Sequence, residues 1–286
     1  NLAHALKDEL HSRGYNPAVR LEIAKDCPKP IVKVLLENFN LPENAVYRIK
    51  GPVNLNRVIQ VYDLAKRPDL KFPNFKQGKV SIDMDEPFES IKENDILMHH
   101  PYQSFKTVLE LLQHAANDPK VLAIKQTLYR TGKDSKIIEH LITAAHNGKD
   151  VSVVVELRAR FDEEANLTLA NELQKAGVQV IYGVVGYKTH AKMMLIVRRE
   201  GKSIRRYVHL GTGNYHAGTA KVYTDIGLLT SHPGITQDVN SIFQQLSGLS
   251  KTIKLKHLLI SPFTLHGSII QKIQREVKLV KSGKPG

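Results

Sequence analysis

The sequence predicts an α/β fold, in which a mixed sheet lies between layers of helices and follows a small α+β piece. Residues 121–129, 151–157 and 178–182 are apolar runs rich in β-branched residues, as is typical of buried strands. Between them, residues 137–145 and 167–176 have the apolar spacing of helices, and each segment ends near a glycine. This alternation at these lengths favours parallel strands joined by right-handed crossovers.

The rest of the chain extends this pattern on both sides. Downstream, residues 190–197 and 205–210 are predicted to form a strand pair, 222–229 a further strand and 235–249 a helix. The tail at 269–280 is predicted to be a basic amphipathic helix. The α+β piece is predicted to contain a helix carrying Leu2, Leu6 and Leu10, strands at 19–23 and 46–49, and helices at 30–39 and 58–65. Pro68 and Pro73 mark the boundary at which this piece ends.

Composition restricts the partners. The chain has 41 Lys and Arg against 28 Asp and Glu, a formal net charge of +13. Such an excess attracts nucleic acid, anionic lipid, nucleotides or phosphate chains, and it is also found on basic surfaces kept only for solubility. No run approaches the roughly 18 apolar residues of a membrane-spanning helix. The single Cys27 excludes an internal disulfide, so we expect a reducing, cytoplasmic location.

The chemistry centres on His190 and Lys192. His-x-Lys on a strand places both side chains on one face, where a neutral imidazole beside an ammonium could attack phosphorus. About twenty residues later, Gly211-Thr212-Gly213-Asn214 offers close backbone approach and an amide that could bind phosphate oxygen or orient a ring. The two motifs together are far more specific than either alone. A merely structural, hydrogen-bonded histidine is the alternative for His190.

At these motifs the sequence resembles one half of the His-Lys-Asp pattern of the phospholipase D superfamily. The superfamily aspartate would fall at Val197, which is apolar. This departure resembles polyphosphate kinases of the histidine-phosphorylating type. Four further stretches carry that resemblance across most of residues 95–250, and they are residues 99–102, 125–130, 160–166 and 223–225.

The resemblance implies roles for individual residues. It makes His190 the phosphohistidine nucleophile, Lys192 and Asn214 its catalytic partners, and Tyr223 a nucleotide contact. It also places Arg130 and Arg160 at the Mg²⁺ and phosphate site. Because a guanidinium has no acceptor atom, we interpret both arginines as phosphate clamps near the metal, also part of the substrate site.

It further implies the organisation and partners of the parent protein. Residues 1–75 would end an α+β middle domain, 76–258 form a phospholipase D-like catalytic domain, and 259–286 begin a second catalytic domain. We therefore expect a fragment with little or no turnover of its own. ATP or ADP and polyphosphate would be the substrates, with Mg²⁺ as cofactor. We expect a homo-oligomer as full-length protein and no nucleic acid, with peripheral association at the inner membrane face left open.

Two other functions remain open from the sequence. A phospholipase D-type phosphodiesterase or nuclease also uses a histidine nucleophile, although it would normally carry the aspartate missing at Val197 and a second His-x-Lys. A non-catalytic polyanion-binding module would use only the basic surface, and its salt-sensitive binding would survive loss of His190.

Overall fold

The structure is a computed structural model of the chain. It describes residues 18–73, 75–129, 135–156, 163–184, 187–249 and 254–285, with the side chains of 163–165 left out. The predicted helix of Leu2, Leu6 and Leu10 lies outside these residues, as do Arg130 and Arg160. The chain divides into two compact units, Asn1–Lys76 and Gln77–Gly286, each of which is described by itself.

The first unit is a small α+β piece, as predicted from the strand-like and helix-like segments before Pro68. Strands β1 (Leu21–Ala24) and β2 (Val46–Ile49) form a two-stranded parallel sheet, and α2 (Lys29–Phe39) connects them. Proline in the first turn of α2 suits a position whose N–H has no helical partner, and Asn40 ends this helix in the left-handed conformation. Helix α3 (Ile59–Leu64) follows, and the described part of the unit also has 3₁₀ segments at Glu43–Ala45, Leu55–Val58 and Pro68–Leu70.

The second unit is built on a seven-stranded mixed sheet in the order β3-β9-β8-β7-β4-β5-β6. The neighbours β4, β5 and β6 are parallel, and the other pairings are antiparallel, which confirms the predicted crossovers and strand pair. The strands span Ile96–His100 (β3), Val121–Leu128 (β4), Asp150–Val155 (β5), Gln179–Tyr182 (β6), Lys192–Glu200 (β7), Ser203–Gly211 (β8) and Asp225–Thr230 (β9).

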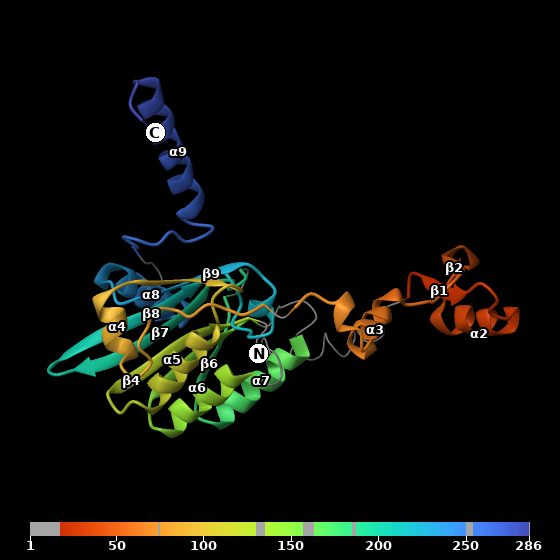
Figure 1. Cartoon of the computed structure of the whole chain (residues 1–286), viewed down its shortest axis with the longest axis horizontal. Helices are drawn as coiled ribbons and strands as arrows, with labels where there is room; N and C mark the ends of the chain where they lie inside the picture. The colour runs from red at the N-terminus through yellow and green to blue at the C-terminus, as the bar shows by residue number, and fades with distance from the viewer. Residues whose placement is uncertain are drawn as a thin grey trace. The chain divides into compact units, whose positions relative to one another are not determined.

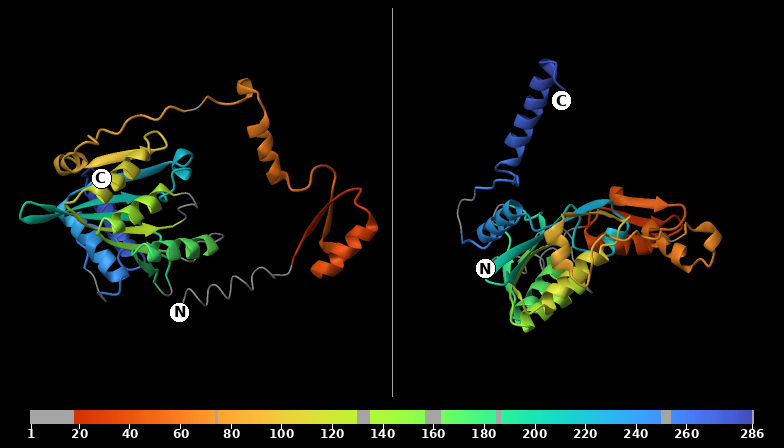
Figure 2. Two further views of the ribbon diagram at one scale, coloured as in Figure 1. Left: turned by 90° about the horizontal axis from the view of Figure 1, so that it is seen from below. Right: turned by 60° about the vertical axis from the view of Figure 1, so that its left-hand side comes forward.

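Helices cover both faces of this sheet, so the predicted α/β class is confirmed. Helices α5, α6 and α7 lie together on one side, and α8 lies on the other (Figures 1 and 2). The helices span Pro87–Glu93 (α4), Lys106–Asn117 (α5), Lys136–His146 (α6), Glu163–Lys175 (α7), Pro233–Leu246 (α8) and Leu265–Lys281 (α9), with a 3₁₀ turn at Thr219–Lys221. The segment that forms α4, β3 and α5 was not predicted from the sequence pattern.

Apolar packing explains why α8 lies where it does. Its buried Val239, Ile242 and Phe243 pack against Met193 and Leu195 of β7, together with neighbouring strand residues. Because side chains alternate along a strand, these β7 residues point to the face opposite Lys192. Burial of each such side chain contributes about 1.5–3 kcal/mol, so the packing fixes the sheet beneath the candidate site.

A buried carboxylate also ties the chain after α8 to that helix. Asp238 is 3% exposed and accepts hydrogen bonds from three consecutive backbone N–H groups, at Lys256, His257 and Leu258, over 2.7–3.1 Å. Burial would raise the pKa of Asp238, but these donors hold it below its usual value. Its stabilising effect is therefore present above about pH 4 and is lost as the pH falls through the folded pKa.

We expect Asp238→Ala to lower the free energy of unfolding by about 2–3 kcal/mol, because it leaves several backbone donors without their acceptor. The amides at 256–258 should also exchange hydrogen faster. Urea unfolding and hydrogen exchange measure the two effects. Gln237→Ala, at the exposed neighbouring position, should change stability by less than about 0.5 kcal/mol. Equal losses in the two variants would contradict this role.

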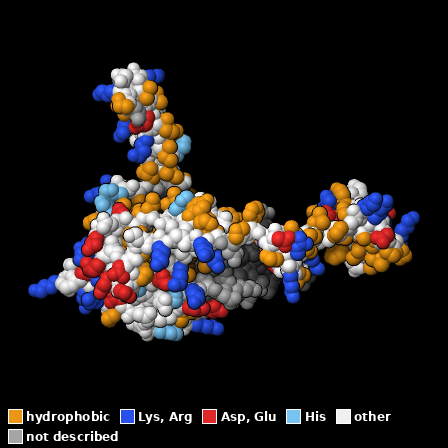
Figure 3. Space-filling view, in the orientation of Figure 1, with side chains coloured by type: hydrophobic (Ala, Val, Ile, Leu, Met, Phe, Trp, Pro, Cys, Tyr) orange, Lys and Arg blue, Asp and Glu red, His pale blue; other side chains and the backbone are white. Residues whose placement is uncertain are grey.

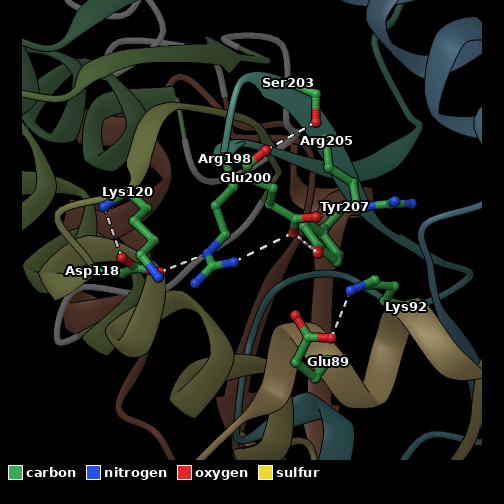
Figure 4. Close-up of polar contacts among 9 residues, drawn as sticks. All are labelled: Glu89, Lys92, Asp118, Lys120, Arg198, Glu200, Ser203, Arg205 and Tyr207. Atoms are coloured by element: carbon green, nitrogen blue, oxygen red, sulfur yellow. Dashed lines mark hydrogen bonds and ion pairs between the residues drawn. The ribbon is translucent and has the colours of Figure 1, made fainter.

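A charged cluster closes the far end of β7, away from His190 (Figure 4). The guanidinium of Arg198 donates to Asp118 over 2.8 Å and to Glu200 over 3.3 Å, and Arg205 and Tyr207 also donate to Glu200. Burial would raise the pKa of Glu200, but these donors hold it below its usual value. An open groove of about 670 Å³ lies beside the cluster and includes acidic residues such as Glu110. This end of the sheet therefore does not favour a polyanion.

The last helix, α9, has an uncovered apolar stripe (Figure 3). It confirms the amphipathic helix predicted for the tail, and five of its aliphatic side chains are exposed: Ile269, Ile270, Ile273, Val277 and Val280. None of the helices in the described parts of the chain has the length and apolar character needed to cross a membrane.

Candidate active site

The segment that carries His190 is held from two sides. On one side, Glu156, which follows β5, accepts a hydrogen bond from the backbone N–H of Thr189 over 2.7 Å. On the other, the Thr127 hydroxyl of β4 donates to the carbonyl of Ala191 over 2.7 Å and accepts from the N–H of Met193 over 3.0 Å. Because these bonds surround His190 on both sides, its backbone position is well defined.

His190 itself is exposed and lies directly against a buried lysine. The Nζ atom of Lys192 is 2.9 Å from Nδ1 and 3.0 Å from Nε2 of His190, and it donates to the His190 carbonyl over 2.5 Å. The Tyr129 ring lies edge-on to the imidazole, with 5.1 Å between centroids. Strand β7 begins only at Lys192, so His190 precedes the strand rather than opening it. The prediction that His190 lies on this strand is therefore wrong, although its side chain does contact that of Lys192.

Burial gives Lys192 an unusual charge state. This side chain is 6% exposed, and burial lowers its pKa to about 8, while Asp225 acts to raise it. The ammonium form therefore predominates at neutral pH, and the amine becomes substantial just above it. An ammonium that is poorly hydrated and touches both ring nitrogens can move to the oxygens of a phosphoryl group as that group approaches the imidazole.

The glycine motif lies beside this pair. Gly211 is the β8 partner of Lys192, so the loop that follows starts next to the lysine. The Thr212 hydroxyl donates to Asp225 over 2.9 Å and accepts from the backbone N–H of Ile226 over 2.9 Å. A Cβ atom at Gly213 would lie only 2.4 Å from Asp225 Oδ2. Only glycine therefore allows the loop to approach this carboxylate so closely.

Asn214 and Tyr223 occupy different surroundings. Asn214 lines a small cavity together with Asp225, His100 and His209, and its amide oxygen is buried. Tyr223 is 63% exposed and lies before β9, which begins at Asp225 instead of at the predicted residue 222. Tyr223 is therefore not a core residue. Its exposed ring is free of the packed interior and is open to a ligand.

Four residues of this region were not predicted from the pattern. Glu156 and Asp225 are carboxylates at the ends of strands. Open α/β sheets build their functional sites at such positions, and this was the one sequence signal that could have identified the two residues as part of the site. No role was predicted for the side chain of His100 or of His209. Both imidazoles are almost fully buried. Sequence alone offers little signal for the burial of a histidine, whether at the end of β3 (His100) or inside β8 (His209).

The described residues offer no ready metal cage. Among them, no group of three or more His, Cys, Asp or Glu side chains is arranged to hold a metal ion. Asp225, the carboxylate beside Lys192, already accepts from Thr212. The proposed clamps Arg130 and Arg160 lie outside the described residues, so their placement stays a prediction.

The surroundings of Val197 explain why this chain has no aspartate at the third position of the His-Lys-Asp pattern. It lies in β7 and packs against the apolar cluster beneath α8. A carboxylate at this position would face that core, on the opposite side of the sheet from Lys192. An apolar residue is what the packing requires here.

These features define an α/β domain with a His-x-Lys pair at the carboxyl edge of its parallel strands. Family models confirm and extend that description: the polyphosphate kinase C-terminal domain 1 matches residues 86–252, and the polyphosphate kinase middle domain matches residues 1–61. The chain belongs to the polyphosphate kinase family.

Individual relatives agree with this assignment. Polyphosphate kinase from Xylella fastidiosa strain 9a5c is 64% identical over 285 residues, which cover 100% of this chain and 41% of that protein. The enzyme from Pseudomonas aeruginosa PAO1 is 50% identical over 287 residues, covering 100% of this chain and 42% of that protein. The chain thus spans about two fifths of the length of the curated relatives it matches.

Solved structures show the same likeness. The crystal structure of polyphosphate kinase from Porphyromonas gingivalis superimposes with a TM-score of 0.75 at 30% identity, covering 93% of this chain and 41% of that one. A phospholipase D family member, Nuc from Salmonella typhimurium, is a weaker likeness. It has a TM-score of 0.43 at 16% identity and covers 54% of this chain and 94% of that one.

Proposed function

We propose that the full-length protein transfers the terminal phosphoryl group of ATP to polyphosphate, and back, through a phosphohistidine at His190. The observation that carries this proposal is the contact of an exposed imidazole with the ammonium of Lys192, at 2.9 and 3.0 Å from its two ring nitrogens. Membership of the polyphosphate kinase family supports it. ATP and polyphosphate are accordingly the proposed substrates.

In the first step, an unprotonated ring nitrogen of His190 attacks the terminal phosphorus of ATP. A P–N bond forms while the bond from phosphorus to the bridging oxygen breaks, and ADP leaves with that electron pair. In the second step, a terminal oxygen of polyphosphate attacks the same phosphorus, the P–N bond breaks and the imidazole is restored. The transferring group carries its negative charge on three equatorial oxygens, which is where fixed cations contribute most.

The described residues have distinct parts in this proposal. Lys192 stabilises the oxygens of the transferring group, Asn214 binds one of them through its amide, and Tyr223 contacts the nucleotide. Glu156 and Thr127 position the His190 segment through its backbone. Mg²⁺ enters as part of the substrate, carried on the phosphates of ATP, and Arg130 and Arg160 are proposed to clamp those phosphates.

The proposal is tested by incubating the full-length protein with ATP labelled in its terminal phosphate. We expect a label that is labile in acid and stable in base, and that mass spectrometry assigns to His190. Residues 1–286 alone should make little or no polyphosphate, because they span only about two fifths of their relatives. Label on a serine, threonine or aspartate, or none at all, would reject a phosphohistidine. Brisk synthesis by residues 1–286 would show that the missing parts are dispensable.

A further inference from the structure

A small polar cavity lies under the glycine motif. It measures about 10 Å³, and Gly211, Gly213 and Gly227 contribute to its lining. Three other lining residues each carry a buried atom that has no hydrogen-bond partner among the described residues, namely Nε2 of His100, Nε2 of His209 and Oδ1 of Asn214. Because a buried polar atom without a partner costs about 1–3 kcal/mol, three such atoms around one space indicate a missing ligand.

Backbone pairing brings the two imidazoles together. Gly211 pairs with Gly227, and Gly227 pairs with Met98, so two residues without side chains leave an opening on the sheet face beside Lys192. A Cβ atom at Gly227 would lie 2.8 Å from Nε2 of His209 and 3.6 Å from Nε2 of His100. Both nitrogens therefore converge on the space above this glycine.

The hydrogen-bond partners of these rings define their protons. Nδ1 of His100 lies 2.8 Å from the carbonyl oxygen of Gln103, so Nδ1 carries the hydrogen and Nε2 is an acceptor. Nδ1 of His209 lies 2.8 Å from the hydroxyl of the buried Tyr215. If that hydroxyl donates to Nδ1, its hydrogen is satisfied and Nε2 of His209 carries a proton. The cavity then contains one donor, His209, and two acceptors, His100 and Asn214.

We propose that one water molecule occupies this cavity, accepting from Nε2–H of His209 and donating to Nε2 of His100 and Oδ1 of Asn214. A water has two hydrogens and free lone pairs, which matches one donor and two acceptors. The volume is about what a single water requires. A metal ion fits less well, because a protonated Nε2 of His209 cannot ligate it.

The water has a consequence for catalysis, which rests on the proposed function. By holding the amide oxygen of Asn214, it fixes the orientation of that side chain and hence the direction of its N–H groups. His100 and His209 are then positioning residues, which act on the transferring phosphoryl group through the water and Asn214 without touching it.

The water itself is tested by a crystal structure of the full-length protein at a resolution that shows ordered solvent. We expect one peak about 2.7–3.2 Å from each of the three atoms, with no anomalous signal for a transition metal. An empty cavity, or a metal ion in it, would overturn the proposal. This measurement is independent of activity, so a wild-type protein that takes no phosphate label would reject the proposed function and leave the water unaffected.

The positioning role is tested by a double-mutant cycle with His100→Leu and Asn214→Ala. His100→Leu should lower kcat roughly tenfold and leave KM for ATP unchanged. If His100 acts through Asn214, the double variant should be no slower than Asn214→Ala alone. Additive losses would contradict this role. His99→Leu, the same change at the exposed neighbour on β3, should have little effect. If His100→Leu does not fold, the wild-type crystal structure still decides whether the water is present, and an empty cavity would overturn the positioning role as well.

Discussion

His190→Gln in the full-length protein is expected to abolish the phosphoenzyme and to lower polyphosphate synthesis by about 10⁴-fold or more. The reason is chemical: the glutamine amide has no nitrogen lone pair that can attack phosphorus, so the covalent route disappears. Glutamine retains polar groups of similar length at this exposed position, and little change in stability is expected. Labelling with ATP, followed by a synthesis assay and a thermal unfolding curve, measures all three quantities.

Two further results test whether His190 itself is the nucleophile. His99→Gln removes an exposed imidazole from β3 and should leave labelling intact, which controls for a general loss of histidine. If His190→Gln still becomes labelled, or synthesises polyphosphate within about tenfold of the wild type, the nucleophile lies elsewhere. Polyphosphate binding that persists in the variant is compatible with the proposal, because the basic charge of the chain is almost unchanged.

Periodicity predicted most of the fold because its strands and helices alternate regularly. β4, α6, β5, α7 and β6 have β-branched runs, amphipathic stripes and glycine punctuation that agree with each other. The strand pair β7 and β8 was also visible in its apolar run. In contrast, α4 and β3 are only seven and five residues long, so they show no clear periodicity. α5 does carry local signals, because its buried residues have helical spacing and Asp118-Pro119 follows it, and the prediction missed them.

The site was predictable only where residues are close in sequence. His190 and Lys192 are two positions apart, so the sequence alone placed them near each other, although His190 precedes β7. Glu156 and Thr127 reach the same segment from β5 and β4, and His100 meets His209 across the sheet through β9. Such contacts depend on the order of the strands in the sheet, and the sequence did not predict where β3, β8 and β9 lie in that order. Asp225 was quoted within a motif, yet its closeness to Lys192 needed the fold.

Lys192→Met is expected to reduce phosphoenzyme formation by about 10²–10³-fold, because it removes the buried cation that contacts the nucleophile. The pH dependence is the sharper result. Burial lowers the pKa of Lys192 to about 8, so the ammonium is lost as the pH rises through that value. In the wild type, kcat/KM for ATP should therefore fall above about pH 8, approaching a tenfold loss per pH unit. Stopped-flow labelling at low ATP concentration measures this descending limb of the pH profile of kcat/KM.

Lys192→Arg shows whether the fall of kcat/KM above pH 8 comes from loss of the positive charge at position 192 or from the titration of another group. A guanidinium stays protonated throughout this range, so the variant should lose the descending limb even if its geometry makes it slower at every pH. Lys188→Met removes a positive charge from the same segment at an exposed position and should retain both the rate, within about tenfold, and the limb. A limb near pH 8 that persists in Lys192→Arg would assign it to another group, and the role of Lys192 as the titrating cation beside His190 would then be rejected.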